Sequence, residues 1–440
     1  MKITFLGAGS TVFAKNVLGD IMLTEEIKDI VIALYDIDGE RLDDSYNMLS
    51  NLLKNIGRKD VRIEKYLGLS ELEKALDGAD VAINAVQVGG YKPSTVIDFE
   101  IPKKYGLRQT IADTLGIGGI FRALRTIPVM KHFADVMEKV CPDVLFLNYT
   151  NPMAVLTGYM LKHTPIKTVG LCHSVQGCAN YLLSELKMDE YVDKCKWHIA
   201  GINHQAWLLE IKDLQGNDLY PEIKRRAKDP ALYESIKNDL VRLEIMNTFG
   251  YYVTESSEHS SEYMPYFIKS RYPELIERYN IPLDEYIRRC EAQIENWVKM
   301  RESLTNNANL THNFSHEYAA GMIKAYVTDK PYRVHGNVLN TNLITNLPSK
   351  ACVEVPCLVD RNGVTPCFVG DLPEQCAAIN RTNINVQLLA IEAAATLRKE
   401  YIYMAAMLDP HTAAELSIDD IRSMCDDLIE AHGDYLPKFR

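Results

Sequence analysis

The stretch Lys2-Ile3-Thr4-Phe5-Leu6-Gly7-Ala8-Gly9-Ser10 joins a short apolar run directly to a pair of glycines. The apolar residues predict a buried strand. Gly7 permits a tight turn, and Gly9 lets the backbone approach a pyrophosphate at the N-terminus of the following helix. The third glycine of the G-x-G-x-x-G pattern is replaced by Val12, so the match is partial. We expect Gly7, Gly9 and Ser10 to bind a dinucleotide.

An acidic residue after the second predicted strand favours NAD over NADP. Val31 to Tyr35 predict this strand, and Asp36 follows it directly. A carboxylate at this place accepts hydrogen bonds from the ribose hydroxyls and disfavours a 2′-phosphate. Asp38 is the competing candidate, and the structural alternative for Asp36 is a helix N-cap.

A second glycine-rich loop, Gln87-Val88-Gly89-Gly90, follows the predicted strand Val81 to Val86. Ligands of open α/β sheets lie at the carboxyl ends of parallel strands. We therefore expect Gln87 and Gly89 to line the NAD site. The alternative is a loop that needs its glycines only for its own turn.

The first 175 residues alternate short β-rich runs with amphipathic helical patterns, which predicts a parallel sheet. The other expected strands are Val61 to Ile63, Val144 to Leu147 and Thr168 to Leu171, and the expected helices include Arg41 to Ile56 and Ile120 to Val140. The predicted fold class is α/β, a Rossmann-type doubly wound parallel sheet similar to lactate and malate dehydrogenases.

Residues 176–440 show a different pattern, in which helical segments dominate. The expected helices are Ala231 to Phe249, Leu283 to Leu304 and Ile384 to Met407, with a β-rich interruption near Val353 to Val369. We expect a C-terminal α+β domain that carries the substrate and metal site and the oligomer contacts.

Composition excludes several classes of partner. The chain has 440 residues with 48 Lys and Arg against 59 Asp and Glu, a net charge of −11, which disfavours nucleic acid as a partner. The chain contains no run of 18 apolar residues, so the sequence predicts no membrane-spanning helix. The ten cysteines form no CxxC pair, and the N-terminus predicts a strand rather than an export signal. We expect free thiols and a cytoplasmic protein.

Further motifs follow the glycine turn in a fixed order: Asp113-Thr114-Leu115-Gly116-Ile117-Gly118-Gly119, Asn148-Tyr149-Thr150-Asn151-Pro152, Gly170-Leu171-Cys172-His173-Ser174 and Gly201-Ile202-Asn203-His204. Together they resemble glycoside hydrolase family 4, the NAD- and Mn-dependent glycosidases. The resemblance continues through Glu255-Ser256-Ser257-Glu258-His259, Asn346-Leu347-Pro348 and Asp409-Pro410-His411-Thr412, and so covers the chain. The Cys-His-Ser triplet and the Glu-Ser-Ser-Glu-His run are similar to the α-galactosidase branch.

This resemblance implies an unusual mechanism of hydrolysis. Most glycosidases cleave the glycosidic bond with two carboxylates, and the NAD-dependent family is an exception. In the family, NAD⁺ takes hydride from C3 of the sugar, and the resulting ketone acidifies the proton on C2. A base removes that proton, a metal stabilises the enediolate, and the glycosidic oxygen leaves. Water then adds at C1, and NADH returns the hydride.

The family's metal ligands match Cys172 and His204 in this chain. Softness alone suits this pair to Zn²⁺ better than to Mn²⁺, and sugar oxygens would add harder ligands. Asn151 matches a residue that binds substrate hydroxyls, and Asn148 is a second candidate. The alternative for Asn151 is an N-cap, because Asn-Pro is also a favoured start of a helix.

The resemblance leaves the catalytic base open. Tyr263 is the best match, with Glu262 and Tyr266 as rivals, and Asp113 matches the acid that assists the base. After the metal cysteine the phospho-specific branches carry an Asp as proton donor, whereas this chain has His173. An imidazolium can serve as that donor. The replacement argues against a 6-phosphorylated substrate.

The sequence therefore predicts an α-galactosidase that acts on unphosphorylated, melibiose-like substrates and forms a homo-oligomer, a dimer or a tetramer. An α-glucosidase or an α-glucuronidase of the same family is an alternative. So is a 2-hydroxyacid dehydrogenase, although such enzymes need no metal. A non-enzymatic NAD sensor would explain the glycine turn but not the pair Cys172 and His204.

Overall fold

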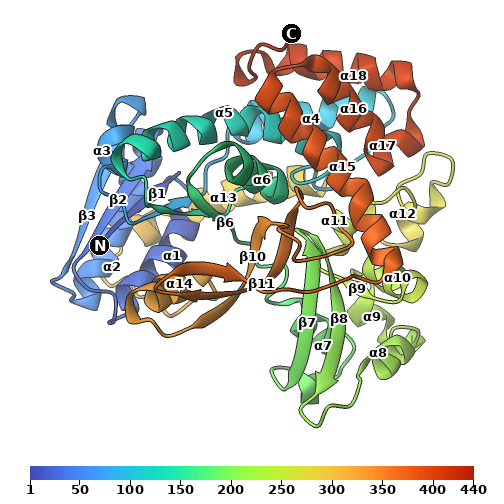
Figure 1. Cartoon of the computed structure of the whole chain (residues 1–440), viewed down its shortest axis with the longest axis horizontal. Helices are drawn as coiled ribbons and strands as arrows, with labels where there is room; N and C mark the ends of the chain where they lie inside the picture. The colour runs from blue at the N-terminus through green and yellow to red at the C-terminus, as the bar shows by residue number, and fades with distance from the viewer.

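A computed structural model describes all 440 residues, which form one mixed sheet flanked by helices (Figure 1). The strands are β1 Lys2–Leu6, β2 Ile30–Asp36, β3 Val61–Leu67, β4 Val81–Asn84, β5 Leu145–Asn148, β6 Lys167–Gly170, β7 Cys195–Ile202, β8 Gln205–Asp213, β9 Tyr252–Val253, β10 Tyr332–Leu339, β11 Cys352–Asp360 and β12 Gly363–Pro366.

Eighteen α-helices accompany these strands. They are α1 Thr11–Leu23, α2 Gly39–Ile56, α3 Leu72–Leu76, α4 Val96–Lys104, α5 Gly116–Val140, α6 Met153–His163, α7 Cys178–Glu185, α8 Tyr220–Arg226, α9 Tyr233–Ile236, α10 Leu240–Phe249, α11 Ser257–Glu262, α12 Glu274–Arg278, α13 Glu285–Thr305, α14 Tyr318–Thr328, α15 Glu374–Thr396, α16 Lys399–Leu408, α17 Pro410–Glu415 and α18 Ile418–His432. None of these helices combines the length and the hydropathy that a membrane span requires.

The parallel half of the sheet has the strand order β3-β2-β1-β4-β5-β6, which confirms the predicted doubly wound fold class. Helices α1, α2 and α14 pack on one face, and α3, α5, α6 and α15 cover the other. All six predicted strands of the first 175 residues are present. Two of them end earlier than expected, β4 at Asn84 and β6 at Gly170.

The second half of the chain extends the same sheet in the order β10-β11-β7-β8-β9, with antiparallel pairing. The proposed boundary near residue 175 follows β6, where parallel pairing gives way to antiparallel pairing. The expected α+β composition is therefore present, but its strands continue the parallel sheet of the first half.

Two of the helix predictions for this half were wrong, because each predicted single helix is divided into two helices in the structure. The segment Ala231 to Phe249 is divided into α9 and α10. The segment Ile384 to Met407 is broken at Leu397, which lies in the left-handed region with φ of 56° and separates α15 from α16. The apolar residues on both sides of each break contact the same core, so the helical periodicity of the sequence continues through the break. For this reason the sequence predicted one helix in each case.

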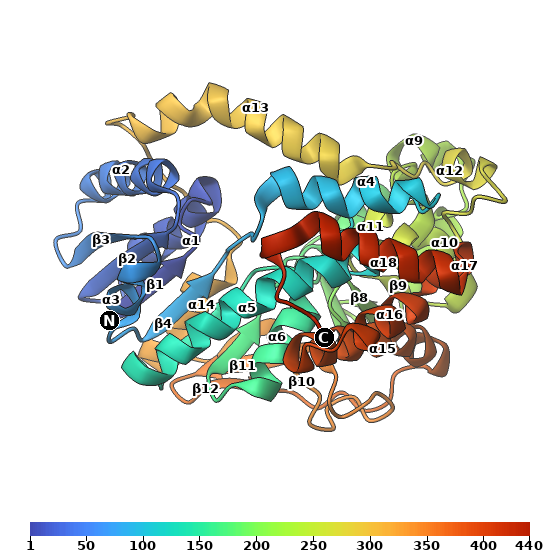
Figure 2. The ribbon, with the colours of Figure 1, turned by 90° about the horizontal axis from the view of Figure 1, so that it is seen from above.

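A buried ion-pair network connects the C-terminal helix to the parallel half of the sheet, and α18 lies beside α4 in Figure 2. Asp98 of α4 accepts hydrogen bonds of 3.1 and 2.6 Å from Arg125 of α5, and His432 of α18 contacts the same carboxylate at 2.9 Å. Arg125 also donates to the carbonyl of Val88 at 3.1 Å. This contact links the network to the glycine loop.

We predict that Asp98→Asn lowers the free energy of unfolding by about 3–5 kcal/mol, because it leaves the Arg125 guanidinium buried without its counter-charge. Urea denaturation measures the change. The matched control is Asp135→Asn, which breaks the exposed Lys131–Asp135 pair of α5 and should cost below about 1 kcal/mol. Equal losses in the two variants would contradict the assignment.

Candidate functional site

The glycine turn after β1 has the geometry of a dinucleotide site. Gly7 has φ of +88°, and a Cβ there would lie 2.9 Å from the carbonyl oxygen of Ala85. Ser10 is exposed, and its side chain does not cap α1, so the first amides of α1 are open to an anion. Val12 is 45% exposed. Its side chain therefore does not hold the helix away from the sheet, and the missing third glycine is tolerated.

The two acidic candidates after β2 have different contacts. Asp38 caps α2, because its carboxylate accepts a hydrogen bond of 3.1 Å from the amide of Arg41. Asp36 instead accepts from the amide of Gly9 at 2.6 Å, which places its carboxylate beside the glycine turn. Asp36 thus stays the candidate for the ribose, and the N-cap alternative belongs to Asp38.

The second glycine loop lies beside the first. A turn with φ of +77° at Gly89 starts the helical segment Gly90–Thr95, and Gln87 is exposed. The bond from Arg125 to the carbonyl of Val88 holds the loop on α5. These features fit the predicted NAD site, because both loops leave the carboxyl ends of adjacent strands, β1 and β4.

Cys172, His204 and Glu255 converge from three separate segments. One ligand atom of each, a thiol sulfur, an imidazole nitrogen and a carboxylate oxygen, lies within 4.8 Å of the others. Cys172 follows β6, His204 lies in the tight connection between β7 and β8, and Glu255 follows β9. His204 and Glu255 have φ of 63° and 65°, a conformation that non-glycine residues adopt at a cost.

The charges of this cluster prepare it for a cation. Burial opposes ionisation of Cys172, but His204 holds the pKa of the thiol below its usual value. Burial also acts against the charged form of His204, yet Glu255 and Cys172 raise its pKa to about 10. The thiol sulfur and the carboxylate therefore both favour positive charge on His204, and a divalent cation bound between them can supply that charge in place of the proton. The carboxylate adds a hard ligand, so the donor set fits Mn²⁺ better than Cys172 and His204 alone.

Tyr263 is buried and lies against His204, with 3.0 Å between its hydroxyl oxygen and Nδ1 of the imidazole. The other ring nitrogen of His204, Nε2, lies 3.4 Å from Glu255. With Nε2 turned to the ligand cluster, Nδ1–H donates to the Tyr263 oxygen, and this bond favours the phenolate. Burial, together with Asp113 and Glu262, raises the pKa of Tyr263 well above its usual value.

The two rivals of Tyr263 lie elsewhere. Tyr266 is 54% exposed and packs against Phe249 and Phe267. Glu262 is buried, and its two carboxylate oxygens accept hydrogen bonds from backbone amides of Thr110, Ile111 and Ala112. Tyr263 is therefore the candidate that contacts the metal-ligating cluster.

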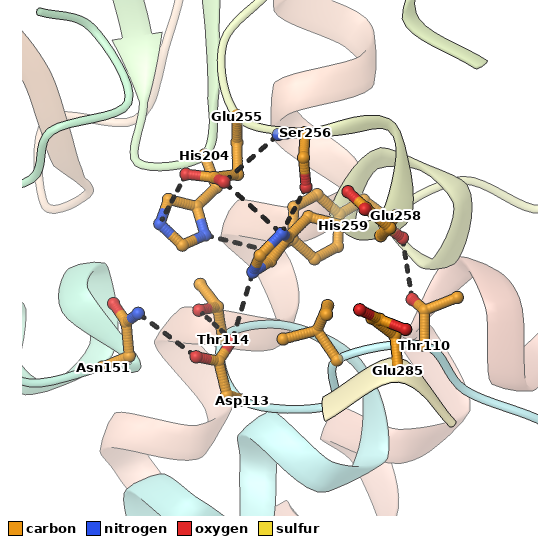
Figure 3. A network of polar contacts seen from close by, with 12 residues as sticks. Thr110, Asp113, Thr114, Asn151, His204, Glu255, Ser256, Glu258, His259 and Glu285 are labelled. Carbon is orange, nitrogen blue, oxygen red and sulfur yellow. Dashed lines mark hydrogen bonds and ion pairs between the residues drawn. The ribbon is translucent and has the colours of Figure 1, made fainter. Parts of the chain in front are cut away.

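Asp113 is connected to the cluster through His259 (Figure 3). His259 lies 3.4 Å from Glu255 on one side and 3.6 Å from Asp113 on the other. Burial alone would raise the pKa of Asp113, but the hydrogen bond and charge of His259 hold it below its usual range. Asp113 is therefore an anion close to Tyr263, as its predicted assisting role requires.

The two asparagine candidates have different contacts. Asn148 is fully buried, and its amide bonds Asn84, Thr150 and Thr157, so it holds the turn after β5. Asn151 does not cap α6. Its Nδ2 lies 3.4 Å from Asp113, and its buried Oδ1 has no protein partner. A free acceptor beside Asp113 makes Asn151 the stronger candidate for a sugar hydroxyl.

His173 lies against the start of α14. Its Nε2 lies 2.7 Å from the carboxylate of Glu317, and its side chain is 49% exposed. The hydrogen bond to Glu317 raises the pKa of His173. An imidazolium at this place can donate a proton to a group that enters from solvent.

Glu255 and His259 were missed as site residues from the sequence. Both belong to the Glu-Ser-Ser-Glu-His run that supports the family resemblance, and they stand four positions apart. An acid and a histidine at that spacing, within a motif of the family, were the available signal. Their roles become visible only when β9 places Glu255 beside His204.

The comparisons with known proteins agree with this geometry. Residues 2–188 match the "Family 4 glycosyl hydrolase" description, and residues 199–412 match its C-terminal domain. The chain belongs to glycoside hydrolase family 4. It is 62% identical to an α-galactosidase of Bacillus subtilis (strain 168), with 100% of both chains covered. It is also 32% identical to an α-galactosidase of Rhizobium meliloti (strain 1021), which covers 100% of this chain and 89% of the relative.

Solved structures of this fold include a 6-phospho-α-glucosidase from gut microorganisms in complex with NAD and Mn²⁺. It has a TM-score of 0.76 at 18% identity and covers 100% of this chain and 99% of its own. This likeness shows that the family 4 enzyme has the fold of that glycosidase.

We predict that Cys172→Ser and Glu255→Gln each weaken Mn²⁺ binding by roughly tenfold or more, because each removes a charged ligand. Titration calorimetry with NAD⁺ present measures the affinity, and NAD⁺ binding itself should change little. Cys195→Ser is the matched control, since Cys195 is half-buried and lies at the opposite end of β7 from His204. Full turnover in excess chelator would contradict the metal assignment.

Proposed function

We propose that this family 4 enzyme hydrolyses unphosphorylated α-galactosides such as melibiose, with NAD⁺ and Mn²⁺ as cofactors. The observation that carries the proposal is the convergence of Cys172, His204 and Glu255 beside Tyr263. A glycosidase that works with two carboxylates needs neither a thiolate nor a buried tyrosine. The 62% identity to an α-galactosidase over the whole chain supports galactose as the sugar.

The cofactors would be held at two neighbouring places. Gly7, Gly9, Ser10, Asp36, Gln87 and Gly89 would bind NAD⁺, and Cys172, His204 and Glu255 would bind the metal. When bound, NAD⁺ supplies a hydride acceptor and Mn²⁺ a Lewis acid for the sugar oxygens, which together make a sugar C–H bond acidic.

Tyr263 would remove the proton from C2 of the sugar. The bond from His204 Nδ1 stabilises the phenolate, while the buried negative charge of Asp113 increases its basicity. His259 keeps Asp113 ionised, so His204, His259 and Asp113 all act on Tyr263. Burial of Tyr263 keeps water from competing for the proton.

Asn151 would bind a sugar hydroxyl through its free buried Oδ1. Both amide atoms of Asn203, the residue before His204, are also buried without a protein partner. Such unsatisfied groups suit a ligand rich in hydroxyls. His173, with its pKa raised by Glu317, would protonate the departing glycosidic oxygen.

The ten free thiols support a reducing compartment, and we propose a cytoplasmic enzyme. A dimer or a tetramer remains our proposal for the assembly. The long helix α13 supports it, because Ile294 and Val298 are 49% and 73% exposed on it. Sedimentation of the purified enzyme measures the assembly state.

We predict that melibiose and nitrophenyl α-galactoside are hydrolysed with a kcat/KM roughly 10²-fold or more above that of the matching α-glucoside or α-glucuronide. The assay contains NAD⁺, Mn²⁺ and a reductant. His173 stands where phospho-specific relatives carry an Asp, so galactoside 6-phosphate should be the poorer substrate. Faster hydrolysis of the 6-phosphate would overturn this assignment, and stoichiometric release of NADH would indicate a dehydrogenase.

A further inference from the structure

The segment 109–115, which carries Asp113, has no helix or strand of its own and is held on one side by α5. A Cβ at Gly118 would lie 2.5 Å from the carbonyl oxygen of Ala112. A Cβ at Gly119 would lie 2.6 Å from the carbonyl carbon of Thr114. The glycines of this motif therefore let the segment lie directly on the first turn of α5.

The other side of the segment is held by one carboxylate. Glu262 Oε2 accepts hydrogen bonds from the amides of Thr110 at 2.8 Å and Ile111 at 3.3 Å. Its Oε1 accepts from the amide of Ala112 at 2.8 Å. Glu262 is 2% exposed, and no cation pairs with it, so these three amides are the main partners of its carboxylate. Burial still raises the pKa of Glu262, to about 7.

The backbone needs this support. Ala112, the residue before Asp113, has φ of 55°, in the left-handed region that a non-glycine residue occupies at a cost. The bond from its amide to Glu262 stabilises the unfavourable conformation, and that conformation sets the direction in which the Asp113 side chain leaves the chain.

We propose that Glu262 is a positioning residue that fixes Asp113 relative to Tyr263 by binding the three amides that precede Asp113. Tyr263 is the next residue after Glu262, so one end of α11 carries the base and also anchors the acid that assists it. The inference rests on the proposed function, because it concerns the removal of the C2 proton. It also gives Glu262 a role of its own, because Glu262 binds backbone amides while its neighbour Tyr263 contacts the metal-ligating cluster.

The test is Glu262→Gln. The amide keeps one acceptor oxygen but turns an NH₂ group toward the backbone amides, so the segment loses one of its two anchors. We expect kcat to fall roughly ten- to hundredfold, because a small misplacement of a catalytic group has an effect of that size. The dissociation constants of NAD⁺ and Mn²⁺ should stay near those of the unmodified enzyme. The primary isotope effect with C2-deuterated galactoside should rise, because proton removal becomes slower.

Glu258→Gln is the matched control. Glu258 stands one turn earlier on α11, and its carboxylate binds Arg289 at 3.1 Å rather than backbone amides. This variant should keep both kcat and the isotope effect. Ala112→Gly serves if Glu262→Gln fails to fold, because glycine adopts the left-handed conformation without strain. This variant loosens the segment. It should lower kcat by less than Glu262→Gln does, and the isotope effect should again rise.

A folded Glu262→Gln variant with unchanged kcat and isotope effect would overturn the inference. Equal losses in the Glu258 and Glu262 variants would overturn it as well, since they would indicate general damage to α11. Failure of the proposed function is a different result: the unmodified enzyme would then show no exchange of the C2 hydrogen with solvent.

Discussion

The meeting of Cys172, His204 and Glu255 requires strands from both halves of the chain to lie in one sheet. β10 and β11 are inserted between β6, which leads to Cys172, and β7, which leads to His204. Four paired residues run across this junction: Gly170, Asn337, Glu354 and Gly201. Asn337 reinforces the row through bonds of 3.3 and 3.2 Å to its neighbours. A change in this register would separate the ligands, because each follows the last residue of its strand by only two residues.

The chemistry follows from how charge is distributed around that meeting point. Glu255 contacts both His204 and His259, and His259 in turn contacts Asp113. A cation bound by Glu255 and His204 therefore acts on the same network that supports Tyr263. The low dielectric of the buried site strengthens each of these interactions. Metal binding and the basicity of Tyr263 are thus physically coupled, which a pair of separate carboxylates would not achieve.

The parallel half and its glycine turn could be predicted, because short apolar strands and turn glycines are local signals. The junction could not, since the pairing of β10 with β6 joins residues far apart in the sequence. Cys172 and His204 were found through their motifs, and the structure places them together as expected. Glu255 was missed, because an acid contacts His204 only after three distant segments have met. The motif favoured Tyr263 but left Tyr266 as a rival, because the sequence does not reveal which of two nearby tyrosines is buried. In the structure Tyr263 is buried and Tyr266 is exposed.

Turnover of melibiose in D₂O tests the proton transfer assigned to Tyr263 most directly. The account predicts galactose that carries deuterium at C2 and keeps its original hydrogen at C3. Tyr263→Phe should abolish both the exchange and the turnover, whereas Tyr266→Phe, at an exposed position, should keep them. Galactose without deuterium at C2, combined with no primary isotope effect for C2-deuterated substrate, would contradict removal of the C2 proton by this enzyme.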